Sequence, residues 1–227
     1  MPELYEINRM NKDESWRMFR IIGELVGGFD ELSAIGPAVT IYGSARLQKD
    51  EPLYAEVEEI ARRLAEVGFA IITGGGGGVM EAANKGAFQA GGTSIGLNID
   101  LPSEQSQNPY TTQAIRFHHF FARKVMLVKY ATAFVIMPGG LGTLDELSEV
   151  ITLIQTEKIE PFPVILFKTD YWHGLMSWME NNALARGFIS PEDMDLLRAC
   201  DDPDQVVEVV QEWYLRNEIV GKKALNR

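Results

Sequence analysis

The stretch PGGLGTLDE, residues 138–146, combines residue types that are suited to holding an anion. Its glycines follow an apolar run at 131–137, and two adjacent carboxylates come next, where a helix is predicted to begin. Glycine lets the backbone approach a ligand closely, and the N–H groups of a helix start point toward an anion. The pattern favours a phosphate-binding loop, with a tight turn that holds no ligand as the alternative.

Two further segments of the same kind are predicted to follow strands, namely YGSAR at 42–46 and TGGGGGVME at 73–81. Ligands of an open α/β sheet bind outside the carboxyl ends of its strands, so the three segments are expected at one edge. Two glycine loops on one edge, beside Ser44 and Arg46, favour an anionic ligand over turns alone. The predicted binding residues in these segments are Gly43, Ser44, Gly75, Gly76, Gly77, Gly139, Gly140, Gly142 and Thr143.

The glycine spacings do not match the two common nucleotide-binding motifs. The dinucleotide pattern G-x-G-x-x-G fails, because its last position holds Val79 in one loop and Asp145 in the other. A Walker loop requires Gly-Lys-Ser/Thr, and the only Gly-Lys pair, at 221–222, is followed by Lys223. A single phosphate on a small nucleotide fits the loops better.

Glu81, Asp145 and Glu146 follow the glycine loops and are the candidate acids. Each also has a structural explanation. Thr143 and Glu146 match the capping box S/T-x-x-E, and acidic residues near a helix N-terminus are favoured by the helix dipole. A functional role gains support because Glu81 and Glu146 both follow glycine loops at neighbouring strand ends, where both could face one crevice.

Residues 115–130 are predicted to form a helix that leads into the strand before the PGG loop. Arg116, His119 and Arg123 share one face at spacings i, i+3 and i+7, so one end of this basic strip is expected to reach the crevice. A surface helix also carries such residues for solubility alone. His118 and His119 are not a convincing metal pair, because adjacent helical residues face different directions, and no metal site is predicted.

The elements around these segments alternate between strand and helix. Apolar runs bounded by glycine or proline predict strands at 37–46, 68–78, 93–99, 131–137 and 162–167. Apolar residues at helical spacing predict helices at 14–35, 51–67, 79–91, 115–130, 142–157, 171–184 and 203–216. This alternation predicts an α/β fold, a doubly wound, Rossmann-like parallel sheet with helices on both faces. We expect one domain over 1–227, with an N-terminal helical extension at 1–36 and a polar loop at 100–114.

The composition restricts the partners of the chain. A formal net charge of −11 over 227 residues argues against a surface for nucleic acid or anionic membrane, because both need clustered Lys and Arg. The only cysteine, Cys200, permits no internal disulfide, and no apolar run resembles a signal core or a membrane span. We therefore expect a cytoplasmic protein without nucleic-acid or membrane partners.

The motifs together resemble those of the LOG family, the cytokinin riboside 5′-monophosphate phosphoribohydrolases, which are often labelled lysine decarboxylases. PGGLGTLDE matches the family pattern PGGxGTxxE, and Arg123-Lys124 matches its Arg-Lys pair. TGGGGGVMEAANKGA at 73–87 resembles the loop TGGGPGxMEAANKGA of the longer bacterial branch. Gly77 replaces the usual proline, which makes this loop more flexible. The similarity extends from about Trp16 to past Pro203.

This resemblance implies hydrolysis of the N-glycosidic bond of AMP or of an N6-modified AMP, giving the free base and ribose 5-phosphate without a cofactor. It carries Arg123 and Glu146 over as the catalytic pair, with Glu81 as a second acid near the ribose or the water. The phosphate cradle it implies is the PGG loop. Further implied substrate contacts are Asp145, Glu81, Glu104 and Lys124.

Two other functions are alternatives for this chain, and its sequence also indicates an oligomeric state. Related folds carry molybdopterin, so a non-catalytic carrier of a nucleotide or of molybdenum cofactor is one alternative. A lysine decarboxylase is the other; it needs a pyridoxal-phosphate Schiff-base lysine, and neither Lys85 nor Lys124 lies in a recognisable cofactor site. The helix predicted at 115–130 is too aromatic for a solvated face, so we expect a homodimer or a larger homo-oligomer.

Overall fold

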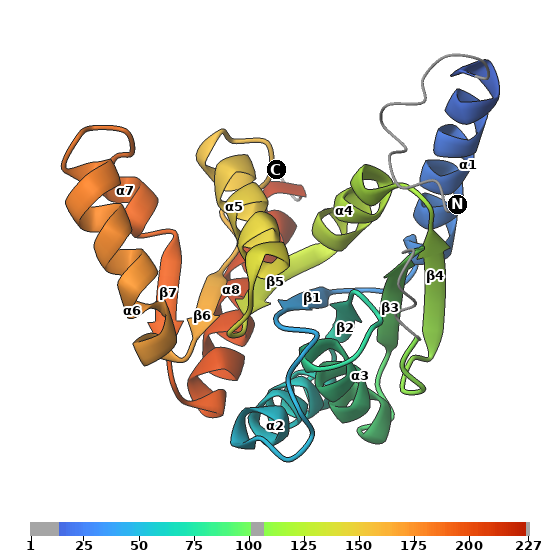
Figure 1. Ribbon diagram of the computed structural model, residues 1–227, viewed down its shortest axis with the longest axis horizontal. Coiled ribbons are helices and arrows are strands. Elements are labelled where there is room, and N and C mark those ends of the chain that lie inside the picture. Colours follow the sequence, from blue (N-terminus) through green and yellow to red (C-terminus); the bar gives the residue numbers. More distant parts are fainter. Residues whose placement is uncertain (1–13, 101–106, 226–227) are drawn as a thin grey trace, which may run out of the picture.

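The computed structural model describes residues 14–100 and 107–225, which form a parallel sheet with helices on both faces (Figure 1). Seven strands lie in the order β4-β3-β2-β1-β5-β6-β7. The strands are β1 (Ala38–Tyr42), β2 (Ala70–Thr73), β3 (Ser94–Ile99), β4 (Gln113–Phe117), β5 (Ala131–Ile136), β6 (Val164–Phe167) and β7 (Leu197–Cys200). The helices are α1 (Glu14–Leu32), α2 (Pro52–Glu66), α3 (Val79–Gln89), α4 (Phe120–Lys129), α5 (Leu141–Gln155), α6 (Thr169–Trp178), the π-helix η2 (Met179–Leu184), α7 (Pro191–Met194) and α8 (Pro203–Leu225). The predicted doubly wound fold is confirmed.

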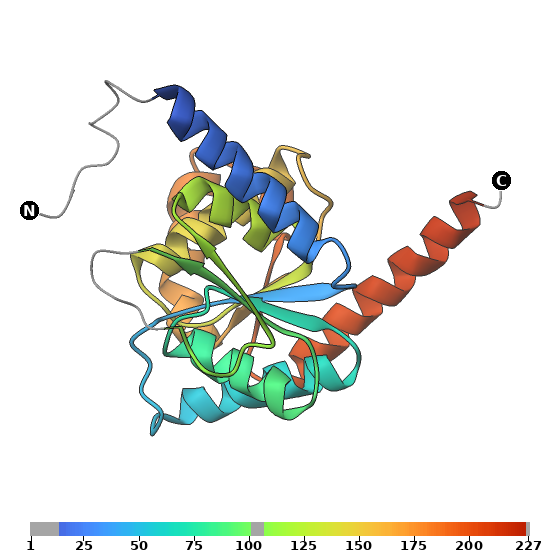
Figure 2. The ribbon, with the colours of Figure 1, turned by 90° about the vertical axis from the view of Figure 1, so that its right-hand side faces the viewer.

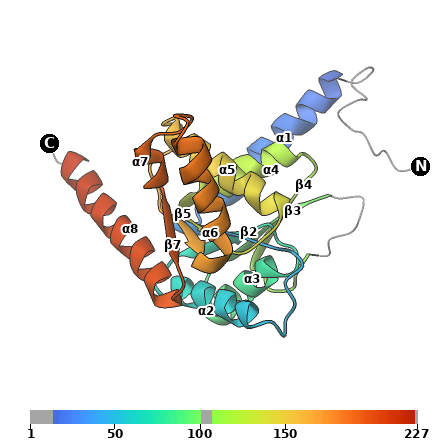
Figure 3. The same cartoon turned by 60° about the vertical axis from the view of Figure 1, so that its left-hand side comes forward.

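Both faces of the sheet are buried, which explains the unbroken apolar runs of its strands (Figures 2 and 3). Alternate residues of β1 show this: Ala38 and Tyr42 pack with α1, α4 and α5, whereas Val39 and Ile41 pack with α2, α3 and α8. Thr40 of this strand donates its hydroxyl to the Leu127 carbonyl oxygen at 2.7 Å, so the burial of Thr40 leaves its own donor satisfied.

The direction in which the strands are added reverses between β1 and β5. The chain passes outward from β1 to β4, returns through α4 to place β5 beside β1, and continues the other way to β7. Tyr42 at the end of β1 pairs with Ile136 at the end of β5. Such a switch point leaves a crevice outside the carboxyl ends of the two central strands, which is where this fold binds ligands.

The sequence-based boundaries were wrong at the two sheet edges. The helix predicted from residue 115 begins at Phe120, because Gln113–Phe117 form edge strand β4 with Ile115 and Phe117 buried and Arg116 exposed. This period of two is too short to distinguish from the start of the following helix. Strand β7 was not predicted, and α8 continues beyond the predicted residue 216 to Leu225.

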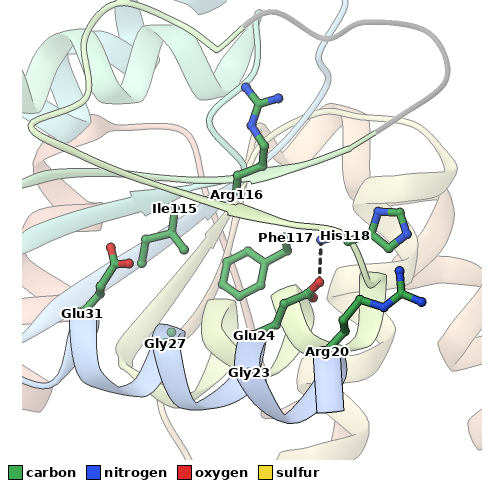
Figure 4. A pocket seen from close by; sticks show the side chains of 10 residues that line it. Arg20, Gly23, Glu24, Gly27, Glu31, Ile115, Arg116, Phe117 and His118 are labelled. Carbon is green, nitrogen blue, oxygen red and sulfur yellow. Dashed lines mark hydrogen bonds between the residues drawn. The ribbon is translucent and has the colours of Figure 1, made fainter. Parts of the chain in front are cut away.

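Helix α1 holds the start of α4 through one carboxylate. Glu24 accepts a hydrogen bond from the backbone N–H group of His118 at 3.2 Å (Figure 4). It also accepts one from the backbone N–H group of His119 at 3.1 Å, and its Oε1 lies 3.1 Å from the His119 Nδ1. A carboxylate beside the first N–H groups of a helix satisfies donors that have no partner inside the helix. The N-terminal extension therefore fixes the helix that carries Arg123 and Lys124.

Replacing Glu24 with alanine is expected to lower the free energy of unfolding by about 1–2 kcal/mol, because the N–H groups at the start of α4 lose their acceptor. Urea denaturation of the full chain measures this. Glu31→Ala is the matched control, since Glu31 is an exposed glutamate of the same helix, and a change below about 0.5 kcal/mol is expected for it. An equal loss in both variants would contradict the capping role.

Candidate active site

A cleft of about 900 Å³ opens at the carboxyl ends of β1 and β5. It is bounded by the segment after β1, the loop between β5 and α5, and the start of α4. The predicted site residues that line it are Gly43, Ser44, Arg123, Gly139, Gly140, Gly142, Thr143, Asp145 and Glu146. The tertiary structure therefore brings together all three segments with unusual chemistry, since Gly74 and Met80 of the segment 73–81 line the cleft as well.

The PGG loop presents the start of α5 to this cleft. The first hydrogen bond of the helix ladder runs from the Leu144 N–H to the Gly140 carbonyl at 3.0 Å, so the N–H groups of Gly142 and Thr143 precede the ladder. The loop is tied to the end of β1 by the Ser44 N–H, which donates to the Pro138 carbonyl at 3.0 Å. These N–H groups and the helix dipole favour an anion at the same point.

Gly139 has no room for a side chain. A Cβ atom there would lie 2.7 Å from the Thr143 Cβ and 2.9 Å from the backbone nitrogen of Ser44. The Gly139 carbonyl also accepts a hydrogen bond from the Tyr171 hydroxyl at 2.6 Å. Tyr171 was not predicted from the sequence, because nothing near it marks α6 as part of the site. Gly140 differs, since a Cβ on it would meet no atom within 4 Å.

The capping-box explanation of Glu146 is wrong. Helix α5 begins at Leu141 with Gly140 as its N-cap, so Thr143 already lies inside the first turn. Thr143 is buried. Glu146 lies more than one turn inside the helix, too far from the N-cap residue Gly140 to take part in capping. Because Gly140 is the N-cap, the Glu146 carboxyl does not make the capping-box hydrogen bond that its spacing from Thr143 predicted.

The Glu146 carboxyl is an unusual acid. Its Oε2 atom is buried and has no hydrogen-bond partner among the residues that the structure describes. Burial raises its pKa from 4.5 to about 7, and Lys124 and Arg123 oppose this rise, whereas Glu149 and Asp145 add to it. An acid with a pKa near neutrality, in a cleft, is suited to proton transfer at physiological pH.

Arg123 supplies positive charge to the same cleft. Its Nε atom is buried and lacks a partner in the described part of the chain. Burial lowers its pKa, and Glu146 counteracts this, but a guanidinium stays charged in proteins. The guanidinium lies against Gly74, where an added Cβ atom would be 2.6 Å from Nη2. Glycine at position 74, which was not among the predicted contacts, therefore makes room for the arginine.

Other predicted contacts lie outside the cleft lining. Glu81 pairs with Lys49 at 2.5 Å, and Lys124 pairs with Asp145 at 2.8 Å and with Glu149 at 3.1 Å. Gly75, Gly76 and Gly77 do not line the cleft either. Glu104 lies outside the described residues. The prediction that Glu81 and Glu146 face one crevice is therefore not met in this conformation.

The basic strip predicted at Arg116, His119 and Arg123 does not form, because the first of these residues is in β4 and the second precedes α4. Arg116 is 3.3 Å from Asp100 on the exposed side of the sheet edge. Arg116 also borders a separate cavity of about 560 Å³ between α1 and β4, which contains none of the predicted catalytic or binding residues (Figure 4). Of the three residues of this predicted strip, Arg123 alone lines the central cleft.

The second glycine loop is held by a buried polar network. Asn108 donates its side-chain amide to the Gly76 carbonyl at 3.0 Å and to Asn84 Oδ1 at 2.9 Å, and its backbone N–H donates to the Gly75 carbonyl at 2.9 Å. The Thr73 hydroxyl donates to the same Asn84 oxygen and accepts from the Gly75 N–H. The loop is therefore fixed by hydrogen bonds even though it consists of glycines.

Gly77 and Gly78 should respond oppositely to alanine. Gly77→Ala is expected to raise the free energy of unfolding by about 0.4–1 kcal/mol, because an added Cβ meets only the Ala45 carbonyl oxygen, at 3.7 Å. Gly78→Ala is expected to lower it by more than about 1 kcal/mol, since φ is +63° and the Cβ would lie 2.6 Å from the Ala45 carbonyl carbon. Urea denaturation of both variants checks this; similar values would contradict it.

The switch-point crevice, the glycine loop before α5 and the buried carboxyl define a class, the Rossmann-like α/β proteins with an anion-binding loop at the sheet edge. The sequence model of a family described as "possible lysine decarboxylase" matches residues 80–210. The chain belongs to this family, whose curated members include cytokinin riboside 5′-monophosphate phosphoribohydrolases. The resemblance found in the motifs is thereby confirmed.

Two curated relatives illustrate the match. A cytokinin riboside 5′-monophosphate phosphoribohydrolase of Arabidopsis thaliana is 30% identical over 170 residues, which cover 73% of this chain and 78% of that protein. The enzyme of the same name from Rhodococcoides fascians is 25% identical over 180 residues, covering 77% and 89%. Among solved structures, the molybdenum cofactor carrier protein of Chlamydomonas reinhardtii is similar with a TM-score of 0.56 and 21% identity, over 79% of this chain and 98% of that one. This last likeness concerns the fold alone.

Residues 14–100 and 107–225 contain neither a candidate membrane span nor a group of candidate metal ligands. No helix in that part of the chain combines the length and the apolar character that crossing a bilayer requires. Within the same residues, no three histidine, cysteine, aspartate or glutamate side chains are grouped as metal ligands.

Proposed function

We propose that this protein hydrolyses the N-glycosidic bond of AMP or of an N6-modified AMP, releasing the free base and ribose 5-phosphate. The observation that carries the proposal is the buried Glu146 carboxyl, which shares one cleft with Arg123 and with the start of α5. An anion site and a neutral-range acid in one cleft match a substrate with a phosphate at one end of its ribose and a scissile bond at the other. The names of the curated relatives agree with this chemistry.

The phosphate is assigned to the PGG loop. The N–H groups of Gly142 and Thr143 precede the helix ladder, and the absence of a side chain at Gly140 leaves space for the ligand oxygens. Binding the phosphate there contributes to catalysis as well as to affinity, because it holds the reacting sugar in place. Arg123 neutralises the phosphate charge or steadies the departing base.

The chemical step follows from the charge that develops on the sugar. As the C1′–N bond breaks, its electron pair leaves on the base and positive charge builds on the ribose, as in glycoside hydrolysis. The Glu146 carboxylate stabilises this charge and accepts a proton from the attacking water, whose oxygen bonds to C1′. That proton then passes to the departing base or to solvent. Glu81 remains the predicted second acid. To reach the substrate, its carboxylate would have to break its ion pair with Lys49, whose side chain is exposed.

Product analysis tests the proposal directly. Purified full-length protein is incubated with AMP, isopentenyl-AMP, GMP and CMP, and free base and ribose 5-phosphate are measured by chromatography. We expect base release from AMP or isopentenyl-AMP and little from GMP and CMP. Binding of AMP without release of adenine would identify a carrier and overturn the proposed reaction.

The description "possible lysine decarboxylase" does not fit the site. A pyridoxal-phosphate enzyme needs a lysine at the cofactor, and among the described residues no lysine lines the cleft. Lys124 is engaged with two carboxylates, and Lys85 pairs with Glu58 at 2.8 Å. A purified protein that absorbs at the wavelength of a pyridoxal aldimine and decarboxylates lysine would contradict this assignment.

We also assign the protein to the cytoplasm and expect it to act as a homodimer. Helices α1 and α4 lie side by side (Figure 2). Both helices expose large apolar side chains. Large apolar side chains exposed together on two neighbouring helices indicate a contact surface, which we call the apolar patch. Phe120 of this patch also lines the cleft, so a second copy would border the site. The members of the patch are Trp16, Met18, Phe19, Ile22, Val26, Phe120, Phe121 and Val125.

Replacing both Phe121 and Val125 with glutamate is expected to convert the dimer into a monomer, because charges on an apolar interface are desolvated without partners. Sedimentation velocity of the variant and of the unmodified chain checks this. Phe188→Glu is the control, since Phe188 is 75% exposed and lies on neither α1 nor α4. An unmodified chain that sediments as a monomer would overturn the proposed interface.

A further inference from the structure

Tyr42 is a cleft residue to which the proposed reaction assigns no role. It is the last residue of β1 and lies on the face of the sheet that α4 and α5 cover. Its ring is buried and stacks on Phe134, with the ring centroids 6.4 Å apart and the planes 5° from parallel. It lines the same cleft as Arg123 and Glu146. Packing alone would be served equally well by phenylalanine.

The Tyr42 hydroxyl is buried and has no hydrogen-bond partner among the residues that the structure describes. The same holds for Arg123 Nε and for Glu146 Oε2, so three polar atoms without partners belong to one cleft. Folded proteins contain few such atoms, because a buried polar atom that lacks a partner is destabilising. Catalytic hydrogen bonds are often long or poorly aligned without substrate and tighten when substrate binds.

The charges around Tyr42 define what its hydroxyl can do. Glu146 and Glu149 of α5 and Arg123 of α4 act on it, and Glu146 in turn is influenced by Lys124 and Asp145. Burial and then the two glutamates raise the pKa of the phenol well above its ordinary value, against the opposing effect of Arg123. The phenol therefore keeps its proton and meets a carboxylate as a hydrogen-bond donor.

We propose that Tyr42 is a positioning residue for Glu146, whose charged carboxylate accepts a hydrogen bond from the Tyr42 hydroxyl while the substrate is bound or the site is closed around it. The bond would orient Oε2 toward the ribose and stabilise the charged form that the reaction needs. The catalytic consequence rests on the proposed function. The interaction between the two side chains does not.

A Tyr42 hydroxyl that serves packing alone and one that donates to Glu146 lead to different pKa values of Glu146 in the variant Tyr42→Phe. If the hydroxyl only occupies space, Tyr42→Phe removes an orphaned polar atom and leaves the Glu146 carboxyl unchanged. If the hydroxyl donates to the carboxylate, its loss disfavours the charged form and raises the pKa of Glu146. The direction of this shift therefore separates positioning from packing.

The test is a titration of the Glu146 carboxyl by ¹³C NMR in the full-length protein with saturating ribose 5-phosphate, with the resonance assigned by its loss in Glu146→Gln. In Tyr42→Phe the midpoint is expected to rise by about 0.5–1 pH unit, the scale of one lost hydrogen bond to a carboxylate. Tyr130→Phe is the control and should leave the midpoint unchanged. The Tyr130 hydroxyl donates to the Phe29 carbonyl at 3.1 Å, and Tyr130 does not line the cleft. An unmoved midpoint in Tyr42→Phe would overturn the inference.

Kinetics with AMP supply a second readout. The acid limb of the kcat profile is expected to move upward by the same amount in Tyr42→Phe, and kcat above both midpoints is expected to fall as well, because Oε2 is no longer oriented toward the ribose. A moved midpoint in a protein that releases no base would support the inference while removing the proposed function. Base release with an unmoved midpoint and an unmoved acid limb would remove the inference alone.

Discussion

Replacing Glu146 with glutamine is expected to lower kcat for AMP by about 10²–10⁴-fold, the usual contribution of a general acid–base group. Glutamine keeps the size and the helical position of the side chain but can neither accept the proton of water nor carry the charge that faces the sugar. The measurement is steady-state release of adenine by both proteins at pH 8, where the unmodified carboxyl, with a pKa of about 7, is mostly charged. Full activity in Glu146→Gln would leave this residue without a catalytic role.

The same variant has a distinct signature in stability. Because the pKa of Glu146 is raised in the folded protein, from 4.5 to about 7, its contribution to stability is complete below about pH 4.5 and is lost as the pH rises through 7. Glutamine has no charge to desolvate, so Glu146→Gln should gain stability relative to the unmodified protein between pH 5.5 and pH 8.5. Melting temperatures at the two pH values measure this. If Glu146 were a capping residue, Glu146→Gln would instead lower the melting temperature at both pH values.

The acid limb of the rate profile should reflect the same ionisation. A carboxylate that stabilises positive charge on the ribose must be ionised, so kcat/KM for AMP, which reports the free protein, is expected to fall as the pH drops through about 7. An ordinary glutamate in solution would place this limb near pH 4.3. A flat profile between pH 5 and 8 would show that the reaction does not depend on the ionisation of Glu146.

Alanine at Gly140 of the PGG loop is expected to weaken the binding of AMP without changing the stability of the fold. Gly140→Ala should raise the KM for AMP by at least about tenfold, equivalent to about 1.4 kcal/mol. Its Cβ would meet no protein atom within 4 Å and would instead occupy the space assigned to the phosphate. The backbone at Gly140, with φ at −93°, accepts alanine, so the melting temperature should not change.

Gly139→Ala is the matched comparison one residue earlier. Its Cβ would overlap Thr143 and the backbone of Ser44, so a loss of about 1–3 kcal/mol in the free energy of unfolding is expected. Urea denaturation and AMP kinetics on both variants give four values. If Gly140→Ala binds AMP as the unmodified chain does, the phosphate is not held where we place it.

Much of the sheet could be predicted because its central strands are buried on both faces. Such strands appear as unbroken apolar runs, and β1, β2, β3, β5 and β6 were all predicted on this basis. The edge strands β4 and β7 were not. Residues 113–117 bury only Ile115 and Phe117, so the local pattern resembles the start of the helix that follows.

The sequence by itself determined the doubly wound class and the PGG loop, because glycine placement and hydrophobic runs are local properties of the chain. Its motifs also named Arg123 and Glu146 as the candidate catalytic pair. Only the tertiary structure decided that Gly140 is the cap and that Glu146 is buried without one. It alone placed Glu81 opposite Lys49 and brought Tyr42 and Tyr171 to the cleft. Burial, pKa and pairing depend on residues distant in the chain, since they measure how much water and which charges surround a group.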